Sequence, residues 1–510
     1  MVKISDAVTD LVIEHGGSVS GEHGDGRART TWNKKLYGNE LWEAFTDLKS
    51  AFDPKWLLNP GNVCGDSDPA ENLRYDGDYK FDAGFEPALN WDNENGFQGM
   101  TELCHGCGGC EGHQDTTGGV MCPTYRATEN EEITSTRGRA NMLRRSMSGD
   151  LPDDVFDDEF IHEVMDLCIG CKGCKRDCPS GVDMAKLKTE VKHEYHQREG
   201  IPLRDRLFAN VESLYSLGST FAPLSNLVTK LPGSNVLMEK TLGIARERDL
   251  PTFKRATLQK WTQPRTPAVS EAEAERKVLL IADPYTNYTQ PEVGKAAVHT
   301  LEAAGVHVEI SETVTDSGRP AHSKGMVDSA RETAELNVAE LAPRVADGWD
   351  IVSVEPSDSV MYQEDYLDLL SGDDVAAVAN NTYSIMEYLD TFRLDDALDV
   401  DAEATLSYHG HCHQTAASRE HHAVGVLRRT GYDVDVLDTT CCGMAGSFGY
   451  EAEHYSMSQA IGQMLFDAAD DSPAQEIVAP GTSCRTQLAD YEQQHGKPPH
   501  PIEKVAAALD

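Results

Sequence analysis

The chain has 510 residues, of which 39% are hydrophobic and 25% are charged, and its formal net charge at pH 7 is −40. One hydrophobic core rarely extends over so long a chain, so we expect two to four domains. The negative charge excludes nucleic acid as a partner, because its phosphates would be repelled.

The acidic residues, 85 against 45 basic ones, are spread along the whole sequence. Such a surface suits molar salt, where charge repulsion is screened within a few ångströms, so we expect a halophile's protein. An ordinary acidic enzyme is the alternative. The start of the chain does not resemble a secretory signal, and apolar runs such as 278–282 are too short to span a bilayer. We therefore expect a cytoplasmic protein without a transmembrane segment, whose only membrane contact would be peripheral, at the inner face.

Residues 1–63 are expected to form the first domain. A helix over 4–15 would end at Gly16-Gly17, with one apolar face formed by Ile4, Val8, Leu11 and Val12. A short strand at 18–20 and a second helix at about 40–52 would follow, the helix packing through Leu41, Phe45 and Leu48. Residues 64–95 are rich in Asp, Asn, Gly and Pro, which indicates a linker.

The remaining segments alternate in character. Residues 96–200 hold most of the cysteines, and 201–275 form a helical connector interrupted by prolines. From residue 276 a buried-strand pattern at 277–282, a helix at 291–304 and a strand at 306–310 predict a βαβ unit. The pattern recurs as a strand at 405–408, a helix through 427–428 and a strand at 433–437. We expect a multi-domain α/β and α+β protein whose last domain, 276–510, has similar halves at 276–395 and 403–510.

Thirteen cysteines in a chain without a secretion signal favour metal sites over a disulfide scaffold. Eight lie between Cys104 and Cys178 and four between Cys412 and Cys484. Cys64 stands outside every spaced group, so we expect that it is not a ligand.

The eight-cysteine region contains the run that binds [4Fe-4S] clusters in bacterial ferredoxins, Cys168-x2-Cys171-x2-Cys174-x3-Cys178-Pro179. A second run, Cys104-x2-Cys107-x2-Cys110-x11-Cys122-Pro123, has the same order with a longer insertion. Since the fourth cysteine of such a run ligates the other cluster, we assign one cluster to Cys104, Cys107, Cys110 and Cys178, and the other to Cys168, Cys171, Cys174 and Cys122. The alternative is a pair of zinc sites, but zinc has no use for three cysteines in succession followed by Cys-Pro.

A basic patch follows the first run, with Arg137, Arg139, Arg144 and Arg145 close together in an otherwise acidic chain. It would offset the negative charge of the clusters or dock a partner. A solvated helix face is the alternative.

The N-terminal segment carries a first resemblance. Residues 16–27 (GGSVSGEHGDGR) and the motif Lys49-x2-Phe52-Asp53-Pro54-x2-Leu57-Leu58-Asn59-Pro60-Gly61 resemble the C-terminal end of FAD-linked oxidases, a family that includes D-lactate, D-2-hydroxyglutarate and glycolate dehydrogenases. The resemblance implies that Glu22 ligates a divalent metal, Zn or Mn, and that His23 is the base that takes the hydroxyl proton of a 2-hydroxy acid. Histidine titrates in the range useful for this role.

In that family the FAD-binding domain precedes this segment, whereas here nothing precedes Met1. We therefore expect FAD to be bound by a missing domain or a partner chain. A split gene, a truncated gene or a wrongly chosen start would each explain the difference.

The C-terminal motifs carry a second resemblance. His411-Cys412-His413, Cys441-Cys442-Gly443 and Gly481-Thr482-Ser483-Cys484 resemble the cysteine-rich CCG domain of heterodisulfide reductases and of glycolate oxidase iron–sulfur subunits. The resemblance implies a third iron–sulfur cluster on Cys412, Cys441, Cys442 and Cys484, with His411 and His413 as hydrogen-bonding neighbours. Zinc or a redox-active dithiol is the alternative.

The first half of the same domain departs from the CCG pattern. It reads Asp316-Ser317-Gly318-Arg319-Pro320 where cysteines often stand, and Pro356-Ser357-Asp358 where Pro-Ser-Cys would follow. We expect no cluster in this half.

The order of the segments resembles that of fused FAD and iron–sulfur D-2-hydroxy-acid dehydrogenases. This implies an oxidoreductase of the D-lactate dehydrogenase type, active with the FAD-binding flavoprotein portion. Electrons would pass from the 2-hydroxy acid (lactate, 2-hydroxyglutarate or glycolate) to FAD and through the clusters to a quinone, cytochrome or other carrier. The alternatives are a non-catalytic electron-transfer subunit that docks to a separate flavoprotein, and a remnant of a broken gene.

Overall fold

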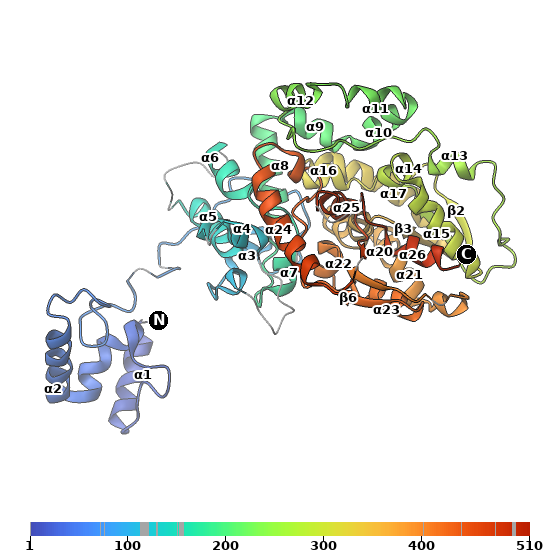
Figure 1. The fold of residues 1–510 in the computed structure, drawn as a ribbon. Helices are drawn as coiled ribbons and strands as arrows, with labels where there is room; N and C mark the ends of the chain where they lie inside the picture. Colours follow the sequence, from blue (N-terminus) through green and yellow to red (C-terminus); the bar gives the residue numbers. More distant parts are fainter. Residues whose placement is uncertain are drawn as a thin grey trace. The chain divides into compact units, whose positions relative to one another are not determined.

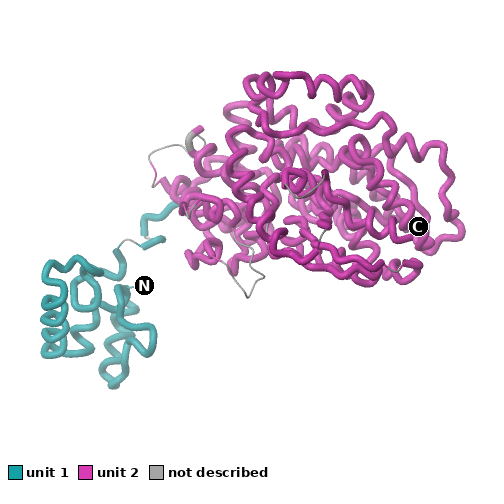
Figure 2. Tube along the Cα trace, viewed as in Figure 1, with its two compact units in different colours: residues 1–81 teal, residues 82–510 magenta. Residues whose placement is uncertain are grey.

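The structure is a computed structural model that describes residues 2–71, 73–75, 77–112, 122–128, 131–149, 151, 158–400, 402–439, 441–474, 476–491 and 496–509. The chain divides into two compact units, Met1–Phe81 and Asp82–Asp510 (Figure 2). Among the described residues, no helix is both long and apolar enough to cross a membrane.

The first unit is built on two helices, α1 (Val2–Glu14) and α2 (Gly26–Phe52), and α2 bends at Gly38, where φ is 78°. Both predicted helices are present, and α2 begins earlier than expected. The predicted strand at 18–20 is wrong, because these residues form a loop. Arg29 holds this loop by donating to the carbonyl oxygens of Val19 (2.7 Å) and Gly24 (2.9 Å).

Several apolar side chains of the first unit are exposed. Ile4, Val8 and Leu11 on α1 are 67%, 54% and 57% exposed. The expectation that Leu41 and Leu48 pack inward is also wrong, since they are 51% and 60% exposed. Phe52, Leu57 and Leu58, near the end of α2 and after it, are exposed as well. By itself, therefore, this unit does not bury the apolar faces of its helices.

The second unit begins with short helices around the ferredoxin-type cysteines: α3 (Gly96–Glu102), η1 (Gly109–Glu111), α4 (Pro123–Ala127), η2 (Glu132–Thr134), α5 (Thr136–Met147), α6 (Asp158–Phe160), η3 (Ile161–Met165), α7 (Gly173–Asp177) and α8 (Met184–Glu199). The end of the expected linker is fastened to this unit. The backbone amides of Ala88 and Leu89 donate to the carboxylate of Glu190, a fully buried residue. The expected domain boundaries stay predictions.

The connector consists of α9 (Leu203–Ala209), α10 (Val211–Thr220), α11 (Leu224–Val228), α12 (Ser234–Leu242) and α13 (Leu258–Thr262). In Figure 1, α9 to α12 lie together, with α9 against α16 (Arg319–Ser323). Arg248, between α12 and α13, fastens this segment to the C-terminal half. Its guanidinium donates to Gly449 O, Ser458 Oγ and Gln487 Oε1, each at 2.8 Å.

In the described part of the α/β region, two parallel sheets are present. The first has the order β2-β1-β3-β4 and the second β6-β5-β7. Their strands are β1 (Lys277–Ile281), β2 (His307–Ile310), β3 (Trp349–Ser353), β4 (Thr382–Ser384), β5 (Thr405–Tyr408), β6 (Asp433–Val436) and β7 (Glu476–Val478). The predicted α/β fold class with two similar halves is confirmed.

Alternate residues of β1 serve two cores, as the two-residue period of a strand requires. Val278 and Leu280 belong to a buried cluster that also contains Leu406 and Tyr408 of β5, so it joins the two halves. Leu279 and Ile281 face a second cluster, formed with the long helix α17 (Val327–Ala346).

The helices of the α/β region follow the strands. Those of the first half, besides α16 and α17, are α14 (Pro284–Tyr288), α15 (Pro291–Ala303), α18 (Pro356–Val360), η4 (Met361–Asp365), α19 (Tyr366–Leu369), α20 (Asp373–Asn380), α21 (Ile385–Thr391) and η5 (Leu394–Ala397). Those of the second half are α22 (Cys412–Ala416), α23 (His421–Arg429), η6 (Phe448–Tyr450), α24 (Tyr455–Asp471), α25 (Thr482–Leu488) and α26 (Pro501–Ala507).

Replacing Arg248 with Met should destabilise the second unit, because several buried acceptors would lose their donor. We expect a loss of about 2–4 kcal/mol, seen as a lower midpoint of urea unfolding. Arg246→Met is the matched control, since this arginine is half exposed and pairs with Glu239. Equal midpoints for the two variants would contradict the anchoring role of Arg248.

Candidate metal centres

The C-terminal cysteines lie at the carboxyl edge of the second sheet. Cys412 follows β5, the vicinal pair Cys441-Cys442 follows β6, and Cys484 follows β7. Because the carboxyl ends of parallel strands meet at one edge, three separate segments bring their cysteines together. The thiol of Cys441 interacts with those of Cys412 and Cys442, and Cys442 in turn with Cys484.

These thiols influence one another strongly. Cys441, Cys442 and Cys484 are 3%, 3% and 1% exposed. Contacts with neighbouring thiols hold the pKa of Cys441 and of Cys484 well above the usual range. The contact with Cys441 instead holds the pKa of Cys442 well below it. A group of buried thiols that cannot all ionise without a counter-charge suits a bound metal or cluster.

The surroundings of these sulfurs also fit a bound group. The backbone amide of Gly443 donates to Cys441 Sγ at 3.4 Å. A Cβ at Gly481 would lie 2.4 Å from His411 Cδ2 and 3.3 Å from Cys484 Sγ, so glycine is required where the backbone passes the site. The four cysteines can therefore hold an iron–sulfur cluster, and this assignment stays a prediction.

His409 is a residue that sequence reasoning missed. Its ring nitrogen and the sulfurs of Cys442 and Cys484 lie within 4.8 Å of one another. The signal was present, because His409 directly follows β5 and opens the run His409-x-His411-Cys412-His413. His411 and His413 instead make hydrogen bonds: His411 Nδ1 accepts from the amide of His413, and His413 Nε2 lies 3.0 Å from Gly170 O.

The two ferredoxin-type loops also bring their cysteines together. One small cavity is lined by Cys104, Cys107, Cys110, Cys122, Cys174 and Cys178, which include the whole set assigned to the first cluster. Gly106 and Gly108, with φ of 79° and 75°, let the chain turn sharply between the cysteines. Burial is the main reason that the pKa of Cys110 is raised to about 11, although the amide of Arg137 donates to its sulfur at 3.4 Å.

The set assigned to the second cluster is similarly close. Burial first, and then Cys412 and Cys174, raise the pKa of Cys171 well above its usual range. The pKa of Cys174 is raised mainly by burial and further by Asp183, Cys168 and Cys122. These placements support the crossed assignment. It stays a prediction, because Cys122 and Cys174, which are assigned to the second cluster, also line the cavity of the first set.

The basic patch divides into buried and paired members. Arg139 is 1% exposed and donates to Cys122 Sγ (3.5 Å) and Val164 O (3.1 Å). Burial would raise the pKa of Cys122, but Arg139 and a hydrogen bond with Thr124 lower it. Arg144 is 7% exposed. The solvated-face alternative is therefore wrong for these two arginines, and Arg139 supplies positive charge to a candidate ligand.

The loop from Cys168 to Cys178 is held against the C-terminal cysteines. Gly170 O is in contact with His413, and Arg176 donates to Thr415 O at 3.1 Å, so the loop lies on α22, whose first residue is Cys412. Lys172, on the same loop, pairs with Asp365 of the first half. The second ferredoxin-type site thus adjoins the C-terminal site.

The first half has a hydrogen bond where the CCG pattern would have cysteines. Ser317 Oγ donates to Asp358 Oδ1 at 2.6 Å, and both residues are buried. Burial and the nearby carboxylates Asp283 and Glu355 raise the pKa of Asp358 well above its usual range. A serine and an acid with a raised pKa replace soft sulfur ligands here.

Glu22 and His23 lie in the exposed loop between α1 and α2. Their side chains are 90% and 79% exposed, with 3.4 Å between His23 Nε2 and Glu22 Oε1. Cys64 lies in the same unit, 8% exposed, whereas the twelve other cysteines belong to the second unit.

Comparisons with known proteins define the class of the chain. Residues 1–63 match the C-terminal domain of FAD linked oxidases, residues 100–182 the 4Fe-4S dicluster domain, and residues 406–489 the cysteine-rich domain. All three domains are present, which confirms the predicted resemblances. The chain is an iron–sulfur protein related to FAD-linked oxidases.

The relatives among curated proteins include two D-2-hydroxyglutarate dehydrogenases. That of Escherichia coli is 28% identical over 99% of this chain, and that of Haemophilus influenzae is 27% identical over 99%. The chain spans about half the length of these relatives, 53% in each case. The glycolate oxidase iron–sulfur subunit of E. coli is 23% identical over 81% of this chain and 95% of its own length.

Anaerobically purified protein should contain about eight iron and eight acid-labile sulfide from the ferredoxin-type sites and about four more of each from the C-terminal site. Cys442→Ser should lose about four iron, because it removes a ligand of one cluster. Cys64→Ser is the matched control and should lose none. Zinc in place of iron, or iron loss from Cys64→Ser, would contradict the ligand assignment.

Proposed function

We propose that this chain is the iron–sulfur part of a dehydrogenase of D-2-hydroxy acids, with lactate, 2-hydroxyglutarate or glycolate as substrate. The observation that carries the proposal is the placement of the Cys168–Cys178 loop directly against α22 and Cys412. A route of adjoining clusters can accept electrons from a flavin and deliver them one at a time. The domain matches and the named relatives support the same class of reaction.

The proposal assigns FAD to a flavoprotein portion that covers the first unit. The exposed apolar side chains of α1 and α2 support this, since such side chains are normally buried against a partner surface. Glu22 and His23 are exposed in the loop between these helices, where a covering portion would enclose them. The glycolate oxidase iron–sulfur subunit is, by its name, a separate iron–sulfur chain of such an enzyme.

In this proposal the chain contributes a base and a metal ligand to the substrate site. When bound, FAD supplies the acceptor for the hydride that leaves C2 of the substrate. His23 would take the hydroxyl proton, and Glu22 would be the residue that ligates a Zn or Mn ion. Arg29 keeps the loop in place through its bonds to Val19 and Gly24.

The expected location belongs to the same proposal: a cytoplasmic protein with peripheral membrane contact at the inner face. A second candidate is a non-catalytic electron-transfer subunit that uses the first unit only to dock. The exposed positions of Glu22 and His23 suit a docking surface as well as a catalytic loop. The two candidates differ in what they predict for a variant of His23.

Supplied with the flavoprotein portion of a D-2-hydroxy-acid dehydrogenase, the chain should support dye reduction by D-lactate or D-2-hydroxyglutarate. His23→Ala should lower kcat by about two to four orders of magnitude, because a general base is lost. His15→Ala is the matched control, because His15 is an exposed histidine directly after the last residue of α1. Steady-state assays with intact cluster spectra test the prediction.

Cys171→Ser should have the complementary effect in the same assay. Flavin reduction by the substrate should persist while transfer to the dye fails. If His23→Ala reacts as fast as His15→Ala, the first unit is a docking element and the electron-transfer-subunit candidate holds. If the isolated chain binds flavin and oxidises the substrate unaided, the assignment of FAD to another portion is wrong.

The net charge of −40 predicts a salt requirement. Raising KCl from low to molar concentration should raise the thermal midpoint, because screening removes repulsion between exposed carboxylates. A variant with Glu332→Gln, Glu335→Gln and Glu340→Gln, all exposed on α17, should depend less on salt. A midpoint that does not rise with KCl would favour an ordinary acidic enzyme.

A further inference from the structure

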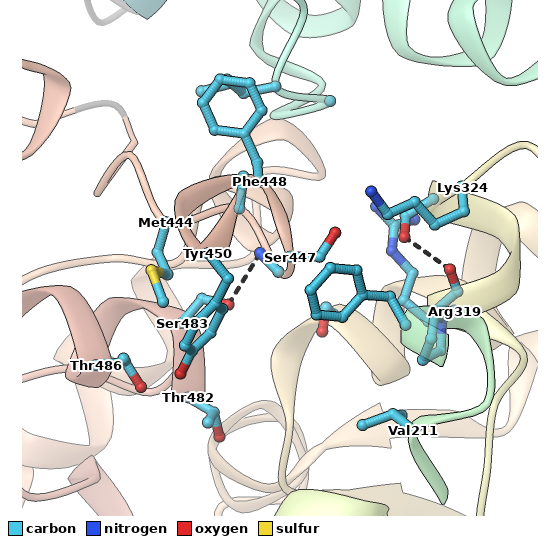
Figure 3. Close-up of a pocket in the computed structure, with 18 of the residues that line it drawn as sticks. Val211, Arg319, Lys324, Met444, Ser447, Phe448, Tyr450, Thr482, Ser483 and Thr486 are labelled. Atoms are coloured by element: carbon cyan, nitrogen blue, oxygen red, sulfur yellow. Dashed lines mark hydrogen bonds between the residues drawn. The ribbon is translucent and has the colours of Figure 1, made fainter. Parts of the chain in front are cut away.

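A cavity of about 560 Å³ lies between the connector and the C-terminal half (Figure 3). Side chains of the connector, among them Val211 and Leu214, line it together with the four C-terminal cysteines. His411 and His413 also belong to the lining, whereas His409 does not. A role for the ring of His409 is therefore to be sought at the sulfurs and not in the cavity.

The position of His409 is fixed by the neighbouring strands. The residue directly follows β5, and its backbone amide donates to Val478 O of β7 at 3.0 Å. His409 is fully buried, and its Nδ1 lies 2.7 Å from Thr439 Oγ1, in the segment after β6. Backbone and ring are thus held from both sides of β5, so the ring has little freedom to turn.

The second ring nitrogen of His409, Nε2, has no such contact. It is buried and makes no hydrogen bond within the described part of the chain. A ring nitrogen of His409 and the sulfurs of Cys442 and Cys484 lie within 4.8 Å of one another. Since Nδ1 is already occupied by Thr439, Nε2 is the nitrogen that is available to a bound group. A buried nitrogen without a partner is costly, and a metal beside these sulfurs would supply the missing contact.

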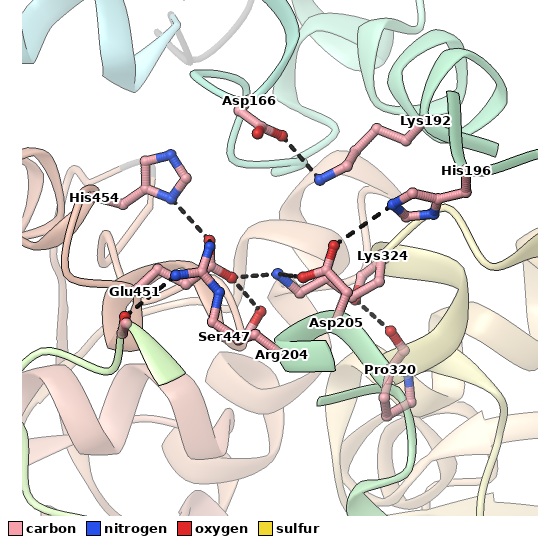
Figure 4. A network of polar contacts seen from close by, with 12 residues as sticks. Asp166, Lys192, His196, Arg204, Asp205, Pro320, Lys324, Ser447, Glu451 and His454 are labelled. Carbon is pink, nitrogen blue, oxygen red and sulfur yellow. Dashed lines mark hydrogen bonds and ion pairs between the residues drawn. The ribbon is translucent and has the colours of Figure 1, made fainter. Parts of the chain in front are cut away.

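Two other buried histidines of the second unit have a different environment (Figure 4). His454 Nδ1 lies 3.0 Å from Glu451 Oε2, and His196 Nε2 lies 3.6 Å from Asp205 Oδ2. Each of these rings faces a carboxylate that can accept its proton or balance its charge. His409 lies with sulfurs instead, and imidazole nitrogen and thiolate sulfur are both good ligands of iron.

The contact with Thr439 suits a metal ligand. A histidine that ligates a metal usually donates its other ring N–H to an oxygen acceptor, which fixes the tautomer and the direction of the ring. Here Nδ1–H can donate to Thr439 Oγ1, which leaves a lone pair on Nε2. A neutral imidazole in this tautomer loses no proton when it binds a metal, whereas a cysteine thiol must lose one.

We infer that Nε2 of His409 ligates an iron of the C-terminal cluster. This inference rests on the proposed function, which requires a cluster at this site, and it names a further ligand of that cluster. The Nε2 lone pair forms the bond to iron and the ring proton stays on Nδ1, so no proton is released and no electron is transferred.

The added ligand has two consequences. The four cysteines and His409 together supply five donors, one more than a cubane with one protein ligand per iron requires, so one iron takes two protein ligands. Because imidazole is neutral, it adds no negative charge to the cluster. The cluster is therefore easier to reduce than it would be with a thiolate in the same place.

The first test uses the full chain, produced with ¹⁵N-labelled histidine and purified anaerobically. Pulsed EPR, in the oxidation state in which the C-terminal cluster is paramagnetic, should show a strongly coupled nitrogen that responds to the label. A nitrogen bonded to iron couples far more strongly than one that only donates a hydrogen bond to a sulfur. The signal should be lost from Cys442→Ser, which lacks this cluster and keeps the ferredoxin-type ones.

The second test replaces the ligand. His409→Cys should retain the cluster and its iron, lose the nitrogen coupling and lower the midpoint potential of this cluster alone, because a thiolate takes the place of the imidazole. His409→Gln should lose the strong coupling as well, although its amide can still donate a hydrogen bond.

His307→Gln is the matched control. His307 is 6% exposed, its Nδ1 lies 2.8 Å from Val269 O, and its Nε2 also makes no hydrogen bond within the described residues. It lies on β2 in the first half, away from the cysteine motifs of the second. Coupling and potential should therefore equal those of the wild type.

The possible failures are distinguishable. A C-terminal cluster without a strongly coupled histidine nitrogen overturns the inference and leaves the proposed function standing. A coupling that persists in His409→Cys but is lost from His411→Gln or His413→Gln assigns the ligand to another histidine and also overturns it. An iron content of about eight per chain, where about twelve are expected, shows that the cluster itself is absent and contradicts the proposed function as well.

Discussion

The buried carboxylate of Asp365 joins three segments on which the candidate electron route depends. It pairs with Lys172 of the second ferredoxin-type loop and with Arg319 of α16, at 2.8 Å. Burial alone would raise the pKa of Asp365, but Lys172, His322 and Arg319 lower it well below its usual range, so it stays ionised. Arg319 in turn reaches His413, next to Cys412. Two cations around one buried anion thus hold the loop between the two halves.

This arrangement explains why the two α/β halves differ. The second half keeps its cysteines at the carboxyl edge of its sheet, where they adjoin the ferredoxin-type loop. In the first half, Ser317 and Asp358 occupy the corresponding motif positions and are hydrogen-bonded to each other. This half instead contributes Arg319 and Asp365, which hold the ferredoxin-type loop. One half therefore carries the candidate ligands, and the other holds the neighbouring loop in position.

The connector has a comparable double role. Arg248 fastens it to the second half through buried hydrogen bonds, while Leu217 and Leu224 remain exposed. Residues 214–237 of the connector contain one charged residue, Lys230, which is unusual in so acidic a chain. The same segment supplies one wall of the cavity beside the C-terminal cysteines, which links its surface to their chemistry.

Local patterns in the sequence determined much of this organisation. The alternation of apolar residues predicted β1 and β2, and the helical period predicted α15. Cysteine spacing predicted the iron–sulfur class. Periodicity and spacing are both readable from the sequence, because they depend on residues that are close together in the chain. They did not predict the exposure of Leu41 and Leu48, nor the loop at 18–20, because burial and strand formation require partners distant in sequence. Only the tertiary structure placed His409 with Cys442, Lys172 with Asp365, and Leu214 at the cavity. These pairings join residues of different segments, and no local spacing encodes them.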